Sequence, residues 1–272
     1  MSVLQFSDFD LFLALGTGPD LRLSKGSRIY QHHLADRYPH GYRAHSFLLK
    51  FHALQACLEN TQQRWLLLLD ADALLVRPIT EDMIRKALIK RGLGMVEQTT
   101  VRGSSMGSKE FLDHYRQHTL AWLAPEAQPP GILAFRYYNS GVVLGERNHF
   151  QEFTSWALAT LDRNPGSHQV GKHMIGDQDY FQYWTNNLHP NTRNTLPWYW
   201  NHCEHWDQGF PRKSAYILHF SNFCLEPTYQ QVLRMYLLRH NAWQAERLID
   251  QVTKSLNEFK LGRGRDPRFG RF

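Results

Sequence analysis

Cysteine is scarce in this sequence, and long apolar runs are absent. The 272 residues include three cysteines, Cys57, Cys203 and Cys224, which are odd in number and widely spaced. They match neither a disulfide framework nor a zinc-binding pattern, so we expect reduced thiols and a cytoplasmic location. No stretch approaches the ~18 apolar residues of a transmembrane helix. The first residues also lack the basic start and apolar core of a signal peptide, so we expect none.

The sequence also has no large excess of charge of either sign. The formal net charge is +6, which is too small to indicate nucleic-acid binding by itself and is compatible with a phosphate-bearing ligand. The tail 260–272 contains four arginines, and such a tail suits weak contact with an anionic membrane surface. Aromatic residues make up 13 % of the chain, which suits core packing or a platform for sugars and flat bases.

The most informative stretch joins an apolar strand to two carboxylates. Four consecutive leucines, residues 66–69, are typical of a strand that is buried on both faces. Asp70 and Asp72 follow where that strand would end. Two carboxylates at the end of a buried strand are costly unless a positive group lies between them. Because hard oxygen ligands suit Mg²⁺ or Mn²⁺, the sequence predicts a divalent metal site here.

The residues before this stretch predict the first units of an α/β fold. Residues 10–15 predict a strand, and Gly16, Thr17 and Gly18 begin the turn that follows it. Such a turn either brings the backbone close to a nucleotide or is an ordinary strand-to-loop turn. Helices are predicted over residues 27–38 and 46–59. Lys50, near the buried face of the second helix, either contacts a phosphate or extends to solvent.

Caps and periodicity predict further elements downstream. Thr80 and Asn148 are expected to cap helices over residues 80–91 and 149–163. Residues 95–97 predict a short strand, and residues 111–122 predict a helix. Two amphipathic helices are expected within residues 226–259.

Two later strands carry polar residues at their ends. Asn139, Ser140 and Gly141 open a buried strand. There, Gly141 either allows a ligand or backbone to approach closely or eases the turn into the strand. His219 lies within a predicted strand over residues 215–223. A lone histidine after an apolar run is usually structural, and here it is also a candidate third ligand for the metal at Asp70 and Asp72.

A helix is predicted to begin at Asp177, Gln178 and Asp179. Capping by Asp177 and the favourable helix dipole at Asp179 explain the two carboxylates without any function. They explain Gln178 less well, which leaves a role in a site open for this turn.

Together and in this order, these motifs resemble the GT-A class of nucleotide-sugar glycosyltransferases. The glycine turn, Tyr30, residues 40–42 and Lys50 look like glycosyltransferase family 34, whereas residues 139–141, 177–179 and 218–221 resemble family 8. The resemblance implies an α/β fold of GT-A type, with a Rossmann-like, mostly parallel mixed sheet flanked by helices. It also implies a catalytic domain over residues 1–225, a helical extension over 226–259 packed on it, and the basic tail 260–272.

The resemblance implies an activity as well. Both families are retaining transferases that use a UDP-sugar and manganese, so the implied partners are a UDP-sugar donor and a glycan or glycoconjugate acceptor, with no nucleic acid. In these families the Asp-x-Asp pair and a late histidine hold Mn²⁺ or Mg²⁺, which matches Asp70, Asp72 and His219. The donor would contact Gly16, Thr17, Gly18, Lys50, Asp70, Ala71, Asp72, Asn139, Ser140 and Gly141.

Roles in the reaction are implied for the turn at 177–179. Asn139 and Asp177 would bind sugar hydroxyls, and Gln178 would stabilise positive charge developing at the anomeric carbon. In a retaining reaction the leaving phosphate could take the acceptor's proton. If the reaction inverts instead, Asp177 or Asp179 is the candidate base.

Two other classes of protein stay open. A haloacid-dehalogenase-like phosphatase also places Asp-x-Asp after a buried strand, with the first Asp as nucleophile, although here α/β units precede the motif. A non-catalytic sugar-binding module would keep the fold without the chemistry. One departure from family 8 matters: residues 222–227 lack the lysine that usually follows the histidine motif. Another basic residue would then have to contact the diphosphate.

Overall fold

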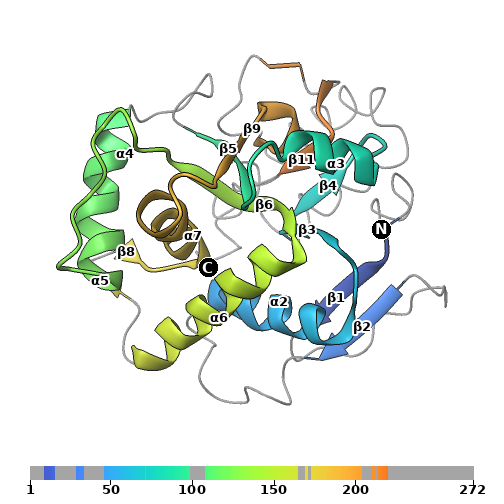
Figure 1. Cartoon of the computed structure of the whole chain (residues 1–272), viewed down its shortest axis with the longest axis horizontal. Helices are drawn as coiled ribbons and strands as arrows, with labels where there is room; N and C mark the ends of the chain where they lie inside the picture. Colours follow the sequence, from blue (N-terminus) through green and yellow to red (C-terminus); the bar gives the residue numbers. More distant parts are fainter. Residues whose placement is uncertain are drawn as a thin grey trace, which may run out of the picture.

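The computed structural model describes residues 9–15, 29–33, 46–70, 72–98, 108–164, 169–170, 173–203, 210–211 and 214–219. At the centre of the described chain lies a four-stranded sheet of order β3-β6-β5-β9 (Figure 1). Its strands are β3 (Trp65–Leu69), β6 (Tyr138–Glu146), β5 (Gly94–Glu97) and β9 (Asn194–Leu196). β6 runs antiparallel to both β3 and β5, and β5 runs parallel to β9.

Side chains of this sheet alternate between two apolar cores. One face is covered by the helices α2 (Leu49–Asn60), α6 (Arg147–Arg163) and α7 (Asp177–Tyr183). The other face packs against α3 (Glu81–Ala87) and a sheet of order β10-β11-β4. Leu66 and Leu68 contact the first core, and Leu67 and Leu69 contact the second. This alternation explains the unbroken leucine run. The leucines are only half-buried, because β3 is an edge strand of this sheet.

Shorter elements complete the described chain. A parallel pair is formed by β1 (Leu11–Leu15) and β2 (Ile29–His33). The second sheet consists of β10 (His202–Cys203), β11 (Ile217–His219) and β4 (Ala73–Leu75). Helical segments are Ser46–Leu48, α4 (Ser108–His114), a π-helical stretch Tyr115–Leu120, α5 (Ala121–Leu123), Trp184–Leu188 and Trp198–Trp200. A hairpin is formed by β7 (Gln169–Val170) and β8 (His173–Met174).

The α/β class expected from the sequence is confirmed, with mixed sheets flanked by helices. Parallel pairing is less prominent than expected, because β6 is antiparallel to both of its neighbours. The limits expected at residues 225 and 259 lie outside the described residues. Among the described helices, none is both long and apolar enough to cross a membrane.

Three predictions about single elements need correction. The helix expected over residues 27–38 is wrong, because residues 29–33 form β2 and pair with β1. Asn148 does not cap a helix, since α6 already begins at Arg147 after the extended residue Glu146. Thr80 does cap α3, and accepts a hydrogen bond from the Met83 amide at 3.3 Å, but this helix ends at Ala87 rather than near residue 91.

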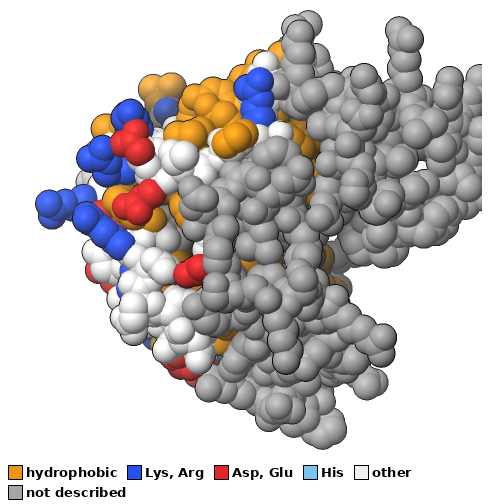
Figure 2. Space-filling view, turned by 90° about the vertical axis from the view of Figure 1, so that its right-hand side faces the viewer, with side chains coloured by type: hydrophobic (Ala, Val, Ile, Leu, Met, Phe, Trp, Pro, Cys, Tyr) orange, Lys and Arg blue, Asp and Glu red, His pale blue; other side chains and the backbone are white. Residues whose placement is uncertain are grey.

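The surface on the side of α3, β1 and β2 is partly described. In Figure 2, basic side chains (blue) lie beside acidic (red) and hydrophobic (orange) ones along one edge of this view. In α3, Asp82 pairs with both Arg85 and Lys86 at 2.6 Å. These side chains are about half exposed or more, and ion pairs of that kind add little to stability. The described part of this edge therefore carries both signs of charge.

Candidate functional site

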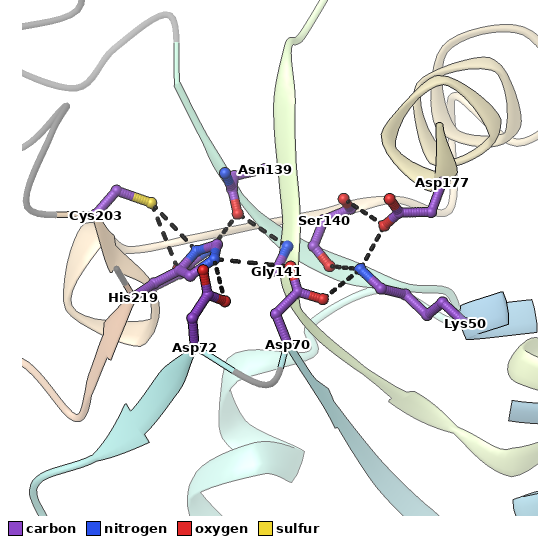
Figure 3. A network of polar contacts seen from close by, with 10 residues as sticks. Lys50, Asp70, Asp72, Asn139, Ser140, Gly141, Asp177, Cys203 and His219 are labelled. Atoms are coloured by element: carbon purple, nitrogen blue, oxygen red, sulfur yellow. Dashed lines mark hydrogen bonds and ion pairs between the residues drawn. The ribbon is translucent and has the colours of Figure 1, made fainter. Parts of the chain in front are cut away.

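Antiparallel pairing brings the two main motifs together. Leu69 of β3 faces Val142 of β6, so the residues after β3 lie beside the residues that begin β6. The amide of Asp70 continues this ladder and donates to the carbonyl of Gly141 at 2.9 Å. A turn follows, in which the amide of Ala73 donates to the carbonyl of Asp70 at 3.0 Å. This turn places the Asp70 and Asp72 side chains next to the start of β6 (Figure 3).

The second sheet adds a histidine to the two carboxylates. β11 runs antiparallel to β4, with His219 opposite Ala73. Nε2 of His219 lies 3.3 Å from Oδ1 of Asp72 and 3.7 Å from Oδ2 of Asp70. One ligand atom from each of the three residues lies within 4.8 Å of the others, and among the described residues this is the one group of three or more that does so. Two carboxylates and an imidazole are a donor set that fits Mn²⁺ or Mg²⁺.

Gly141 leaves the room that the imidazole occupies. A Cβ atom placed on this glycine would lie 2.0 Å from Cε1 of His219 and 2.5 Å from its Nδ1. The sequence predicted that Gly141 allows a close approach, and the approaching group is the ring of His219.

The far side of the imidazole is held by two buried residues. Nδ1 of His219 lies 3.1 Å from Oδ1 of Asn201 and 3.5 Å from the sulfur of Cys203. Because a carboxamide oxygen only accepts, Nδ1 carries the hydrogen in this contact, and Nε2 is directed to the carboxylates. The amide group of Asn201 donates to Oδ1 of Asn139 at 2.8 Å, and the Gly141 amide donates to the same oxygen at 2.9 Å.

Without a metal ion, the charges of His219 and Asp72 stabilise each other. Burial lowers the pKa of His219, but Cys203 and Asp72 outweigh it and raise that pKa to about 10. Burial raises the pKa of Asp72, but its hydrogen bond to His219 and the charge of His219 outweigh burial and lower it. A protonated imidazole therefore balances the carboxylates when metal is absent. Metal binding would release this proton.

Lys50 joins the metal-ligand candidates to α7. Its ammonium group lies 2.5 Å from Oδ1 of Asp70, donates to the Ser140 carbonyl at 3.3 Å and bonds to Oδ2 of Asp177. Its side chain is 13 % exposed, so it does not extend to solvent. Burial lowers the pKa of Lys50, but the charges of Asp177 and Asp70 raise it by a larger amount, so that the pKa lies above its ordinary value. Lys50 is therefore charged throughout the physiological range.

Asp177 faces this group from the first turn of α7. Its Oδ2 accepts from Oγ of Ser140 at 2.8 Å as well as from Lys50. Gly176, and not Asp177, is the N-cap of the helix. Burial and the charge of Asp70 together raise the pKa of Asp177 by more than Lys50 and Ser140 lower it. The side chain thus belongs to a compact polar network rather than to a cap.

The two residues after Asp177 have other partners. Nε2 of Gln178 donates to the hydroxyl of Tyr137 at 3.0 Å. Asp179 is buried, accepts from the hydroxyl of Thr119 and the amide of Gly176, and lies 3.3 Å from Nε2 of His173. Asp179 therefore ties the start of α7 to neighbouring elements.

Several sequence-predicted site residues lie outside the described chain. These are Gly16, Thr17, Gly18 and Ala71. Lys50, Asp70, Asp72, Asn139, Ser140, Gly141, Asp177 and His219 come together in one network (Figure 3). The sequence did not indicate Asn201, Cys203 or Tyr137. Asn201 stands in an aromatic stretch and Cys203 follows it closely, so neither carries a recognisable motif.

Comparisons with known proteins add little to this geometry. No protein-family model and no curated protein matches the chain. Among solved structures, the chain is similar to the apo form of mouse xyloside xylosyltransferase 1, at 18 % identity and a TM-score of 0.38. The match covers 74 % of this chain and 77 % of that one. A likeness at that TM-score carries no argument about function.

Proposed function

We propose that this protein is a metal-dependent glycosyltransferase that moves a sugar from a UDP-sugar to a hydroxyl group of a glycan or glycoconjugate, with retention. The convergence of Asp70, Asp72 and His219 within 4.8 Å carries the proposal. A divalent cation bound by these residues would act as a Lewis acid and make the diphosphate a better leaving group. The sequence resemblance to GT-A transferases supports the assignment of a nucleotide-sugar donor.

Lys50 is well suited to supply the second positive charge that a diphosphate needs. The lysine expected after the histidine motif is absent, and Lys50 already lies beside Asp70 and Asp177. If Asp70 bound a metal cation, Lys50 would still have Asp177 as a partner and further hydrogens to donate to a phosphate oxygen. In this proposal Lys50 replaces the missing lysine.

The first turn of α7 would position the sugar. No described residue hydrogen-bonds Oδ1 of Asp177, so this oxygen is available to accept from a sugar hydroxyl. No described residue hydrogen-bonds Oε1 of Gln178, which leaves a carbonyl dipole to stabilise positive charge at the anomeric carbon. Asp179 has three protein partners. If the reaction inverts, Asp177 is therefore the better candidate base.

The first test is Mn²⁺-dependent hydrolysis or transfer from a set of UDP-hexoses and UDP-pentoses. We expect Asp72→Ala to lower the rate by more than about 100-fold, because a lost ligand costs more than the 10–100-fold of a residue that only orients one. Asp82→Ala is the matched control, since Asp82 lies on the exposed face of α3. Full activity in Asp72→Ala would disprove the site assignment.

A thermal-shift measurement separates the transferase from the other two classes. A UDP-sugar with Mn²⁺ at 100 times its Kd should stabilise the fold by about 2.7 kcal/mol, which is roughly 5–10 °C in Tm. Stabilisation without turnover of any donor would favour a binding module. Phosphate release from an aryl phosphate, lost in Asp70→Asn, would favour a phosphatase.

A further inference from the structure

Three histidines form a second cluster of metal-ligating side chains. His114 ends α4, and His118 lies four residues later in the π-helical stretch. Their ring centroids are 4.6 Å apart. His173 of β8 completes the cluster, with its centroid 4.7 Å from that of His114 and 4.6 Å from that of His118. Figure 1 shows α4, β8 and α7 side by side in this part of the molecule.

We propose that His114, His118 and His173 bind a Zn²⁺ ion at a site separate from Asp70, Asp72 and His219. Two histidines four residues apart on a helix, with a third from another element, are a ligand set typical of zinc. With a Zn–N distance of about 2.0–2.1 Å, tetrahedral geometry places the centroids of two bound imidazoles roughly 5 Å apart. The three centroid distances of 4.6–4.7 Å are close to that value.

Asp179 would orient one of the ligands. It lies 3.3 Å from Nε2 of His173, and its side chain is 8 % exposed. A hydrogen on Nε2 donated to this carboxylate leaves the lone pair on Nδ1, which is the nitrogen available to a metal. Histidines that bind metals commonly donate their other N–H to a carboxylate in this way. The negative charge of Asp179 also favours a cation in the cluster.

Each of the other two imidazoles has a ring nitrogen without a hydrogen-bond partner among the described residues. Nδ1 of His118 is buried and has no hydrogen-bond partner. No described residue hydrogen-bonds a ring nitrogen of His114. Burial and the neighbouring histidines lower the pKa of His114 and of His118, which favours the neutral form that binds metals.

Metal binding requires the rings to turn. The Asp70, Asp72 and His219 group is the one described set whose ligand atoms already lie within 4.8 Å of one another. The nitrogens of the three histidines do not yet converge to this extent, although the rings are in contact. The proposal therefore requires that rotation about the side-chain torsions bring one nitrogen of each ring to a common point.

The two sites differ in the metals they should prefer. Imidazole ligands suit Zn²⁺, whereas carboxylate oxygens suit Mg²⁺ and Mn²⁺. The test is Zn²⁺ titration of the full chain carrying Asp72→Ala, in the presence of excess Mn²⁺. We expect about one Zn²⁺ per chain. His114→Ala, His118→Ala and His173→Ala, each added to Asp72→Ala, should weaken its binding by at least about 10-fold. Asp179→Asn should weaken it by about 10–100-fold.

His149→Ala, added to Asp72→Ala, is the matched control, because His149 is a half-buried helical histidine outside both groups. Its Zn²⁺ affinity should not change. Equal affinity in the three histidine variants and the control would overturn the proposal. Where a variant fails to fold, imidazole ¹⁵N spectra of the Asp72→Ala chain provide the readout. Zn²⁺ should shift three histidines together, and a shift of fewer than three would also overturn it.

Discussion

Gly141 is the residue at which the parts of the candidate site meet. Its carbonyl accepts from the Asp70 amide, and its own amide donates to Oδ1 of Asn139. Its missing side chain leaves space for the His219 ring. One backbone position thus sets the separation between the Asp-x-Asp turn and the histidine.

Gly141→Ala should disturb the site and the fold together. The new Cβ would lie 2.0 Å from Cε1 of a buried ring that has little space to move into. We expect the free energy of unfolding to fall by about 1–3 kcal/mol. We also expect the affinity for Mn²⁺ to fall, because His219 is displaced. Urea denaturation and Mn²⁺ titration measure both effects. Gly131→Ala is the control, since nothing lies within 4 Å of its added Cβ. If the two variants behaved alike, this ring position would be wrong.

The sequence predicted the residues with distinctive chemistry and missed those that support them. Asp70 and Asp72 could be recognised because they directly follow an apolar strand. Asn201 and Cys203 contact His219 only because β10 pairs with β11. Neither residue differs locally from an ordinary buried polar or thiol side chain, so their role depends on strand pairing that no local pattern encodes.

At the scale of elements, the first turn of α7 divides its residues between two tasks. Successive helical residues point about 100° apart, since a turn takes 3.6 residues. Asp177 therefore faces Lys50 and Ser140, whereas Asp179 faces Thr119 and His173. Asp179 also accepts from the Gly176 amide. The position of Asp177 thus depends on the anchoring of Asp179.

Thr119→Val tests whether Asp179 is an anchor. The substitution keeps the shape of a fully buried side chain but removes the hydroxyl that donates to Oδ1 of Asp179. We expect a loss of about 1–3 kcal/mol in unfolding free energy, because a buried carboxylate oxygen loses its partner. Chemical denaturation measures this loss. If Asp179 were instead a catalytic base, the main effect would be on kcat.

Thr154→Val provides the matched comparison for this experiment. Thr154 is also buried in a helix, but its hydroxyl has no hydrogen-bond partner. Its replacement should leave stability unchanged or raise it. An equal loss in both variants would mean that the contact with Asp179 contributes nothing.

Most elements followed from periodicity and caps, and the main error has a tertiary cause. Residues 27–38 carry a pattern compatible with a helix, yet residues 29–33 form β2 in parallel register with β1. Ile29 and Tyr30 also favour strands. Short segments of this kind take the structure that a neighbouring strand imposes, and the sequence alone does not show that the neighbour is adjacent.

At the scale of the whole molecule, the antiparallel pairing of β3 and β6 determines where the candidate site lies. In open α/β sheets, ligands usually bind at the carboxyl ends of parallel strands. Here β6 is antiparallel to β3, so the amino end of β6 meets the carboxyl end of β3. Asn139, Ser140 and Gly141 therefore reach Asp70 from the opposite strand direction. Local patterns predicted which strands carry the motifs at residues 70–72 and 139–141. They could not determine the relative direction of β3 and β6, because the long connection between these strands allows either direction.

His219 should make the stability of the whole metal-free protein depend on pH. Burial opposes its charge, but Cys203 and Asp72 raise its pKa from 6.5 in the unfolded chain to about 10. The folded state therefore binds this proton more tightly. The resulting stability is fully present below about pH 6.5 and is lost as the pH rises through about 10. A group of this kind changes the unfolding free energy by at most about 1.4 kcal/mol per pH unit.

His219→Gln isolates this effect, because glutamine cannot take up the proton. Urea denaturation of both proteins, with a chelator present, should give a stability difference that shrinks between pH 6.5 and 10. A constant difference over that range would show that His219 is neutral in the folded state. The same proton competes with a divalent cation for Nε2, so chelator-free samples with Mn²⁺ should lose less stability over this range than metal-free ones.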